Sequence, residues 1–373
     1  MCGIVGYVGK EQAAPILLDG LARLEYRGYD SAGICVADGA RLRVCKAKGR
    51  LDNLRAISHE GSDLPGTLGI GHTRWATHGE PNDVNSHPHL SQSGNIALVH
   101  NGIIENYAEL KAYLIGKGMQ FSSDTDSEVV VQLLEYYHKK YEGDLMRAVY
   151  RVLATIEGAY AFGIVCAERP HEMIAARKDA PLLLGYGDSC NFIASDATAI
   201  IRHTREVSYM EDGEVAILTA DSIRVFDARR EPIEKERHTI DWEISAAEKG
   251  GYAHFMMKEM MEEPEALRRT ISPHIHDGRI FFEGLQLSAD TLENMSRLYI
   301  VACGSSYHVG MVCKYNFEKM LRIPVEVQLA SEVRYSSPIV DDKTLVIIIS
   351  QSGETLDTMA ALREAKSLGA RIL

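Results

Sequence analysis

The chain opens with MCGIVGYVGK, residues 1–10, where a cysteine follows the initiator methionine and leads into an apolar run. Ile4 and Val5 predict a buried strand that begins a sheet. Cys2 has two interpretations on this stretch alone. It is either a small apolar residue at the start of that strand, or, after removal of Met1, a terminal nucleophile with its α-amino group beside its thiol.

A terminal cysteine carries a nucleophile and a base on one residue. The thiolate is the nucleophile, and its ordinary pKa is about 8.5. An exposed α-amino group has a pKa of about 7.7 to 8, so it can accept a proton near neutrality. It can activate the thiol directly or through a water, and no catalytic His is required. While Met1 remains, this nitrogen is part of an amide, so Cys2 should be silent.

The bulk properties describe an ordinary globular protein of two or three domains. The chain has 373 residues, of which 46% are hydrophobic and 25% charged. A net charge of -12 disfavours a nucleic-acid backbone or an anionic membrane as a partner. Apolar runs such as residues 345–349 have only strand length, and the start lacks the pattern of a signal peptide.

The cysteines fit a reducing compartment. Their number, seven, is odd, and the sequence has no C-x-x-C pair, which favours free thiols over a disulfide framework or a zinc site. We therefore expect a cytoplasmic protein without a metal. The cysteines are Cys2, Cys35, Cys45, Cys166, Cys190, Cys303 and Cys313.

Residues 1–240 form the first predicted domain. Leucines at helical spacing predict a helix that starts near Pro15, and Asp38-Gly39 predicts a hairpin between two strands. Many strands and few helices predict an α+β domain with antiparallel sheets. Further strands are predicted over residues 67–72, 96–100, 159–166, 192–194 and 214–218, and helices over 106–114, 127–141 and 144–156.

Residues 241–373 form the second predicted domain. A connector and helix over 243–270, rich in Met and Glu, come first. Continuous apolar strands, each followed by a polar turn, are then typical of a parallel sheet in a doubly wound α/β domain. These strands are predicted over residues 298–302, 325–329 and 344–349, with helices that end near Met320 and Ser367.

The end of the chain, residues 370–373, has the pattern of a further strand. A parallel sheet of three strands leaves much of its edge exposed. We therefore expect that the second domain is incomplete and that the chain is truncated.

The stretch GHTRWATHGEPNDVNSHPH, residues 71–89, is rich in groups that bind ligands. Arg74 offers a planar fork suited to a carboxylate, although a lone Arg is by default part of a surface ion pair. A zinc site is the alternative for the histidines, but their spacings of six, nine and two match no standard zinc pattern. These histidines are His72, His78, His87 and His89.

Two further stretches carry polar groups near predicted element ends. In ALVHNGIIENY, Asn101 and Gly102 either form a turn after a strand or donate an amide and a backbone N–H to an oxyanion. In SSDTDSEVV, Thr125 and Glu128 have the spacing of a capping box. Asp126 lies in the first helical turn, where it either complements the helix dipole or receives a substrate ammonium.

Five motifs occur in the order of a known family. MCGIVGYVG, YRGYDSAG (residues 26–33), GHTRWATHG, HNGIIENY and SDTDSE resemble the glutaminase domain of class II glutamine amidotransferases, which are N-terminal nucleophile hydrolases. The resemblance implies a four-layer α+β domain with antiparallel sheets between helices. It also implies that Cys2 attacks the side-chain amide of glutamine and releases ammonia through a γ-glutamyl thioester.

The resemblance assigns roles to individual residues. Asn101 and Gly102 would form the oxyanion hole, and Asp126 would hold the α-ammonium of glutamine. Arg27 would belong to a glutamine-binding loop near the nucleophile, and Trp75 would gate the path along which ammonia leaves. The rest of the glutamine site, including the contacts to the α-carboxylate, would consist of Arg74, Thr77 and His78.

Two serine-rich stretches follow strands of the second half. CGSSYH, residues 303–308, and SQSGET, residues 350–355, each open a predicted helix. Hydroxyl and N–H groups at helix N-termini suit a phosphate monoester, although Ser also caps helices routinely. Two such clusters at one sheet edge favour a ligand crevice. A G-x-x-x-x-G-K-[ST] loop is absent from the sequence, which disfavours a nucleoside triphosphate.

These stretches, with AEKGGYAHFMMKEM (residues 247–260) and LASEVRY (329–335), resemble the sugar isomerase (SIS) domain of the glucosamine-6-phosphate synthase family. The resemblance implies a partial doubly wound domain that binds fructose-6-phosphate, no cofactor, and a homodimer for the full-length protein. Ser305 stands where many members are expected to have Thr. The implied sugar-phosphate residues are Cys303, Gly304, Ser305, Ser306, Ser350, Gln351, Ser352 and Thr355.

The implied activity is that of a transferase. Ammonia from glutamine would convert fructose-6-phosphate into glucosamine-6-phosphate, the first step of hexosamine and UDP-N-acetylglucosamine synthesis. The second isomerase subdomain is not found in the sequence, so glutaminase activity at most is expected from this chain. Another class II amidotransferase would need an Asp-rich phosphoribosyl strand or a pyrophosphate loop. A non-catalytic sugar-phosphate sensor would carry a basic helix-turn-helix in front.

Overall fold

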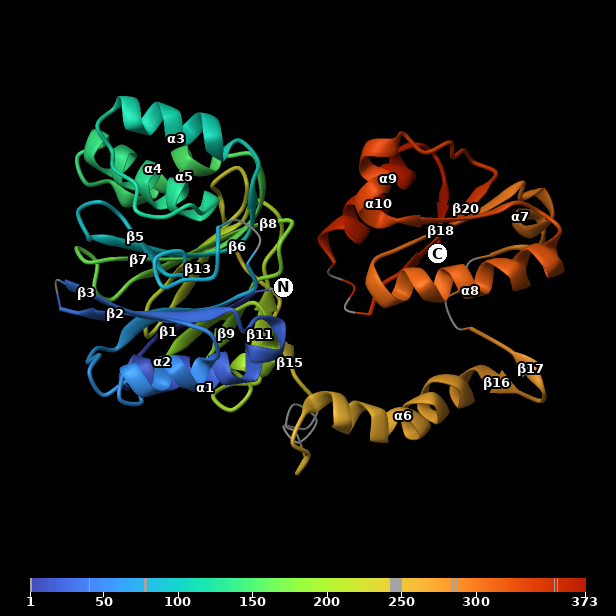
Figure 1. Ribbon diagram of the computed structural model, residues 1–373, viewed down its shortest axis with the longest axis horizontal. Helices are drawn as coiled ribbons and strands as arrows, with labels where there is room; N and C mark the ends of the chain where they lie inside the picture. The colour runs from blue at the N-terminus through green and yellow to red at the C-terminus, as the bar shows by residue number, and fades with distance from the viewer. Residues whose placement is uncertain are drawn as a thin grey trace. The chain divides into compact units, whose positions relative to one another are not determined.

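The chain forms two compact units, residues 1–253 and 254–373 (Figure 1). The domain boundary predicted between residues 240 and 241 stays a prediction. The computed structural model describes residues 2–39, 41–76, 79–241, 250–282, 285, 287–351, 353 and 355–373.

The first unit contains two antiparallel sheets. In the described residues one sheet has eight strands in the order β15-β11-β9-β10-β1-β4-β2-β3, and the other has seven in the order β14-β13-β12-β8-β7-β6-β5. The strands of the first sheet are β1 (Gly3–Val8), β2 (Ser31–Asp38), β3 (Arg41–Lys48), β4 (Leu68–Arg74), β9 (Leu183–Tyr186), β10 (Asn191–Ala194), β11 (Glu206–Tyr209) and β15 (His238–Thr239). Those of the second are β5 (His89–Leu90), β6 (Ile96–Ile104), β7 (Gly158–Cys166), β8 (Met173–Lys178), β12 (Val215–Leu218), β13 (Ile223–Phe226) and β14 (Pro232–Ile233).

Helices cover the outer face of each sheet. One apolar cluster joins α1 (Ala13–Leu24) and α2 (Leu51–Ile57) to the first sheet. Another joins α3 (Tyr107–Gly116), α4 (Asp126–Lys140) and α5 (Leu145–Leu153) to the second. A third cluster lies between the two sheets. Figure 1 shows the resulting order of helices, sheet, sheet and helices, and the predicted four-layer α+β fold is confirmed.

Strand β1 is buried on both faces, which explains its continuous apolar sequence. Ile4 and Val8 point between the sheets, whereas Val5 and Tyr7 pack in the cluster that contains α1. A side chain at Gly6 would lie 2.5 Å from the sulfur of Met173. The strand is therefore fixed from all sides, and Cys2 directly precedes it.

The local predictions for the first unit hold with small differences. α1 begins two residues before Pro15 and buries the predicted leucines. β2 and β3 form the predicted hairpin, but Asp38 pairs with Arg41 and so ends the strand instead of entering the turn. The Thr125 hydroxyl accepts the N–H of Glu128 at 3.3 Å and caps α4 as predicted. The Glu128 carboxylate, however, accepts the N–H groups of residues 122 and 123.

The second unit contains a parallel sheet with the order β19-β18-β20-β21 in its described residues. Helix α8 covers one face, and α9 and α10 cover the other (Figure 1). The predicted doubly wound α/β arrangement is confirmed. The elements are α7 (Ala289–Asn294), β18 (Arg297–Ala302), α8 (Gly304–Leu321), β19 (Val325–Leu329), α9 (Ala330–Ser336), β20 (Thr344–Ile349), α10 (Leu356–Ser367) and β21 (Arg371–Ile372).

Helix α6 (Phe255–Ile271) precedes this sheet, with the small hairpin of β16 (Ile275–His276) and β17 (Arg279–Ile280) after it. The helix predicted from residue 243 is wrong at its start as far as the described residues show. Residues 250–254 are not helical, because Gly250 and Gly251 have φ angles of +58° and +88°. Residues 242–249 lie outside the described residues. Among the helices that are described, none has the length and apolar character needed to cross a membrane.

Candidate functional site

Cys2 is half-buried at the start of β1, against residue 75. The backbone N–H of Trp75 donates to the Cys2 sulfur at 3.2 Å, and the thiol faces the Trp75 carbonyl at 3.5 Å. Burial raises the pKa of the Cys2 thiol, although the Trp75 N–H and the Arg74 guanidinium act in the opposite direction. At rest Cys2 is therefore a neutral thiol held by the backbone of Trp75.

The loop that carries YRGYD holds the segment after β4. The N–H of Asp30 donates to the Arg74 carbonyl at 3.0 Å, and its carboxylate accepts the N–H of Ala76 at 2.8 Å. A side chain at Gly28 would lie 2.7 Å from the Arg74 carbonyl carbon, so glycine permits the close approach of the two backbones. Asp30 therefore fixes the segment whose Trp75 N–H contacts the Cys2 sulfur.

Arg27 and Tyr29 of this loop contact Asp196 and Trp75. The Arg27 guanidinium pairs with Asp196 at 2.5 Å, and Tyr26 donates to the same carboxylate at 2.9 Å. Burial acts to raise the pKa of Asp196, but Arg27 and N–H donors outweigh it and lower this pKa. The Trp75 indole is 44% exposed and meets the Tyr29 ring edge-on at 5.4 Å. Arg27 thus anchors the loop, and Trp75 stands at its surface.

Asn101 and Gly102 lie near the end of β6. The Asn101 side-chain nitrogen donates to the Cys2 carbonyl at 3.1 Å. Its side-chain oxygen lies 3.0 Å from Nε2 of His72. Gly102 has a φ of +134°, and a side chain there would meet the Ala159 carbonyl oxygen at 2.0 Å. Only glycine fits this position, and the amide donor of Asn101 lies beside Cys2.

Arg74 is 4% exposed at the end of β4. Its guanidinium donates to the carbonyl oxygens of Gly79 at 3.2 Å and Glu80 at 3.4 Å. Burial lowers the pKa of Arg74, while Cys2 and Asp126 act to raise it. A buried cation that interacts with Cys2 is chemically suited to a bound carboxylate.

Asp126 is 5% exposed in the first turn of α4. One carboxylate oxygen accepts the N–H of Ile104 at 2.8 Å, which ties it to β6 two residues beyond Gly102. The structure therefore groups Cys2, Arg74 and the β6 residues with this carboxylate. Thr77 and His78, which were predicted beside them, lie outside the described residues.

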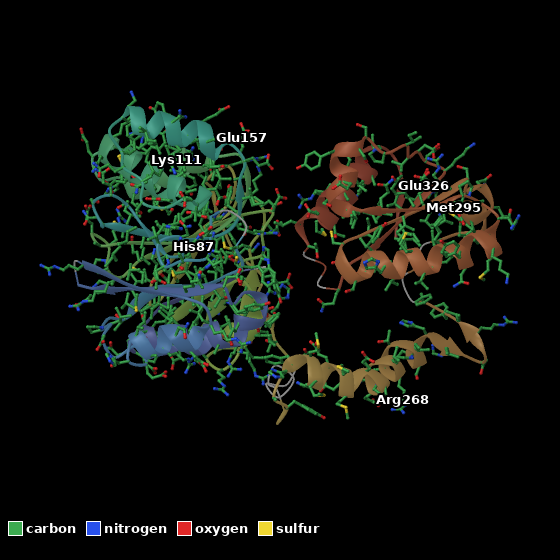
Figure 2. All side chains as sticks on the ribbon, in the orientation of Figure 1. His87, Lys111, Glu157, Arg268, Met295 and Glu326 are labelled. Atoms are coloured by element: carbon green, nitrogen blue, oxygen red, sulfur yellow. The ribbon has the colours of Figure 1, made fainter. Side chains whose placement is uncertain are left out.

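Four buried histidines form a layer next to this site. The His72 and His87 rings stack with centroids 4.2 Å apart, and His87 and His89 meet edge-on at 4.6 Å. His100 donates its backbone N–H to Nδ1 of His87 at 3.2 Å. Figure 2 shows His87 in the interior of the first unit. Among the described residues, no group of three or more His, Cys, Asp or Glu side chains is arranged to hold a metal.

In the second unit, the two serine-rich stretches meet at one edge of the parallel sheet. Ala302 and Ile349 pair in register, so Cys303 and Ser350 leave β18 and β20 side by side. The Thr358 hydroxyl lies 3.7 Å from the Cys303 sulfur, which joins the two strand ends.

The helix starts at this edge are open to solvent. Gly304 and Ser305 are exposed and Ser306 is half-buried in the first turn of α8. The Ser350 hydroxyl accepts the N–H of Gly353 at 3.0 Å, and Thr355 precedes α10. Gln351 is exposed, and Ser352 lies outside the described residues.

Two domain families match the sequence, the glutamine amidotransferase domain over residues 46–227 and the SIS domain over residues 291–373. Over its full length the chain is 54% identical to the glutamine--fructose-6-phosphate aminotransferase [isomerizing] of Caldanaerobacter subterraneus subsp. tengcongensis. The chain therefore combines a glutamine amidotransferase domain with SIS-domain sequence. The equally named protein of Clostridium tetani is 51% identical over the same extent, and the chain spans 61% of the length of each relative.

A solved structure supports the fold of this amidotransferase. The glutamine phosphoribosylpyrophosphate amidotransferase from B. subtilis matches 99% of this chain and 80% of its own, with a TM-score of 0.52 and 22% sequence identity. At this identity the likeness shows the fold alone.

Two residues that support this site, Asp30 and Asn85, were not singled out from the sequence, and His72 was considered only as a metal ligand. Asp30 stands in YRGYDSAG and Asn85 in GHTRWATHGEPNDVNSHPH, and these positions were the available signal. The role of Asn85 depends on two loops that meet only in the folded chain.

Proposed function

We propose that Cys2 hydrolyses L-glutamine, and that the whole protein passes the ammonia to fructose-6-phosphate to form glucosamine-6-phosphate. The observation that carries the first part is that the Asn101 amide bonds the Cys2 carbonyl, while the buried Arg74 interacts electrostatically with both Cys2 and the buried Asp126. A thiol, a neutral donor, a cation and a carboxylate match the side-chain amide, the oxyanion and the two charged α-substituents of glutamine.

Glutamine binding follows from the two buried charges. Arg74, with Thr77 and His78, would hold the α-carboxylate side, and Asp126 would hold the α-ammonium. Arg27 would act through the loop that it anchors to Asp196. The two ends of the amino acid would then fix its side-chain amide near the sulfur, as required for a near-attack geometry.

In the proposed reaction, the α-amino group of Cys2 accepts the thiol proton after Met1 is removed. The sulfur bonds to the amide carbon, and the resulting oxyanion accepts from the Asn101 side chain and the Gly102 N–H. The carbon–nitrogen bond breaks, the leaving nitrogen takes the proton, and ammonia departs from a γ-glutamyl thioester. Water then attacks the thioester, which releases glutamate and restores the thiol. The net reaction converts glutamine and water into glutamate and ammonia.

The second unit would receive the sugar phosphate. The N–H and hydroxyl groups at the helix starts, Ser305–Ser306 and Ser350–Gln351, would donate to the phosphate. The proposed site would also include Cys303, Gly304, Ser352 and Thr355. Trp75 would gate the release of ammonia. Identity above 50% to two named relatives supports this assignment, and the expected homodimer follows from the family resemblance. Seven unpaired cysteines support a cytoplasmic location.

The test combines a glutaminase assay with a measurement of the intact mass of the chain. The purified chain is expected to release glutamate and ammonia from glutamine, and Cys2→Ala is expected to abolish both. Intact mass before and after treatment with a glutamine-analogue electrophile should show loss of Met1 and one adduct on Cys2. An adduct on Cys35 or Cys303 in its place, or full activity of Cys2→Ala, would overturn the proposal.

A further inference from the structure

His72 makes a pair of contacts that define its protonation state. It is 1% exposed on β4, and its Nε2 lies 3.1 Å from the His100 carbonyl oxygen and 3.0 Å from the Asn101 side-chain oxygen. A carbonyl oxygen can only accept, so Nε2 must carry the hydrogen. Nδ1 is buried without a partner among the described residues. Burial lowers the pKa of His72 to about 3, so the ring is neutral.

The orientation of the Asn101 amide follows from the same hydrogen. With its oxygen toward His72, the amide accepts from Nε2 and donates from its nitrogen to the Cys2 carbonyl at 3.1 Å. A rotated amide would set NH₂ against the Nε2 hydrogen and oxygen against the Cys2 carbonyl. A donor would then face a donor and an acceptor would face an acceptor, which is costly in a buried site.

We propose that His72 is a positioning residue that turns the nitrogen of the Asn101 amide toward Cys2, so that one N–H bonds the Cys2 carbonyl and the other is left to donate to the oxyanion. This inference rests on the proposed function of Asn101 as an oxyanion donor. In this positioning role, His72 does not touch the substrate. Its contribution is to remove the alternative orientation in advance, so that no reorganisation is needed when the oxyanion forms.

The neighbouring histidines hold the His72 ring in its plane. His87 stacks on it at 4.2 Å and takes its own hydrogen bond from the His100 N–H at 3.2 Å. His100 in turn bonds Ser127 through Nδ1 at 2.8 Å. The ring that orients Asn101 is therefore part of a packed layer and has little freedom to rotate.

The kinetic test uses two substitutions at one position. His72→Phe keeps a ring and removes the donor, and His72→Gln replaces Nε2–H by an amide N–H. His72→Phe is expected to lower kcat for glutamine hydrolysis about 10²-fold with KM within about two-fold, as for loss of an oxyanion donor. His72→Gln should recover at least about ten-fold of that loss.

His138→Phe is the matched control. His138 is also buried with Nε2 3.1 Å from a backbone carbonyl, that of Gly143. It lies twelve residues beyond Asp126 on α4, or about 18 Å along the helix axis. This variant should keep kcat within about two-fold even where it unfolds at a lower temperature.

Coupling to Asn101 separates positioning from general damage. In an Asn101→Ala background, His72→Phe should cost less than about two-fold in kcat, because the group that it orients is gone. An equal loss in both backgrounds, a rise in KM with unchanged kcat, or unchanged kcat in His72→Phe would each overturn the proposal.

A measurement without catalysis completes the test. In the unsubstituted chain with ¹⁵N-labelled histidine, the His72 signals should show the Nε2–H tautomer from pH 5 to 8. An Nδ1–H tautomer or titration in that range would overturn the proposal, even where His72→Phe fails to fold. If the chain hydrolyses no glutamine but His72 shows this tautomer, the proposed function fails and the orientation of Asn101 stands.

Discussion

The side-chain amide of Asn85 connects the loop that holds Arg74 to the residue two positions before Asp126. Its nitrogen donates to the Glu80 carbonyl at 3.0 Å, and its oxygen accepts the N–H of Asp124 at 3.0 Å. Asn85 is 1% exposed. The same Glu80 carbonyl receives the Arg74 guanidinium, so one amide sets the spacing between the two buried charges.

Asn85→Ala is therefore expected to weaken glutamine binding more than chemistry. Loss of a buried hydrogen-bonded amide costs about 1 kcal/mol per bond, which predicts a KM for glutamine raised about 5-fold to 30-fold. kcat should stay within about three-fold, since Cys2 and Asn101 are not touched. Steady-state kinetics of glutamate release measure both. Asn53→Ala, which removes an exposed amide that donates to the Lys48 carbonyl at 2.8 Å, is the control; equal effects from the two variants would contradict the prediction.

Gly102→Ala should destabilise the first unit strongly. The new carbon would lie 2.0 Å from the Ala159 carbonyl oxygen at a φ of +134°, so β6 and β7 must separate locally. We expect a loss of about 3 kcal/mol or more, as for other changes that force strain into a packed site. Gly94→Ala has a positive φ of +75° but open space around it, and should cost only about 1 kcal/mol. Denaturant unfolding of both variants tests the difference.

The raised pKa of Cys2 predicts how its reactivity depends on pH. Burial disfavours the thiolate, so in the absence of glutamine the alkylation rate should keep rising with pH beyond about 8.5, the midpoint of an ordinary cysteine. Peptide mapping after timed iodoacetamide treatment follows the N-terminal peptide separately from the other six cysteines. A rate that levels off below pH 8 would contradict the prediction.

The buried histidine layer predicts loss of stability in acid. Burial lowers the pKa of His72, His87, His89 and His100 in the folded chain. At these histidines the unfolded chain therefore binds more protons than the folded chain below about pH 6.5. Their contribution to the free energy of unfolding is complete above that pH and declines as the pH falls below it. Each fully neutral histidine contributes a slope of about 1.4 kcal/mol per pH unit in this range.

His87→Phe should reduce this slope by the contribution of one histidine, about 1.4 kcal/mol per pH unit. The carboxylates contribute equally to both chains, so the difference in unfolding free energy between variant and unsubstituted chain isolates the effect. Urea unfolding at intervals between pH 4.5 and 6.5 measures it. An unchanged slope would mean that His87 takes up its proton without unfolding.

The sequence predicted the antiparallel strands and the helices of the first unit because burial leaves local signals, whereas the role of Cys2 stays a prediction. The apolar run of β1 and the leucine spacing of α1 reflect burial, which periodicity reports directly. Cys2, Arg74 and Asp126 stand in motifs whose residue types match the atoms of glutamine.

The supporting contacts could not be predicted, because they join segments far apart in the chain. His72 and Asn101 are 29 residues apart, and Arg27 and Asp196 are 169 apart. The start of α6 was missed because Met and Glu favour a helix while Gly250 and Gly251, with their positive φ angles, prevent it from extending back through them. The Glu128 carboxylate accepts the N–H groups of Ser122 and Ser123, which precede α4. Residue spacing along α4 does not show where these serines lie.

The bond from the Trp75 N–H to the Cys2 sulfur places a residue with an exposed indole against the thiol. A sulfur that carries an acyl group is a poorer acceptor than a thiol or thiolate, so acylation of Cys2 is expected to weaken this bond, next to the Tyr29–Trp75 ring contact. The chain has two tryptophans, Trp75 and Trp242. In a Trp242→Phe chain, tryptophan fluorescence would come from Trp75 alone and should follow acylation of Cys2 optically, without a coupled assay.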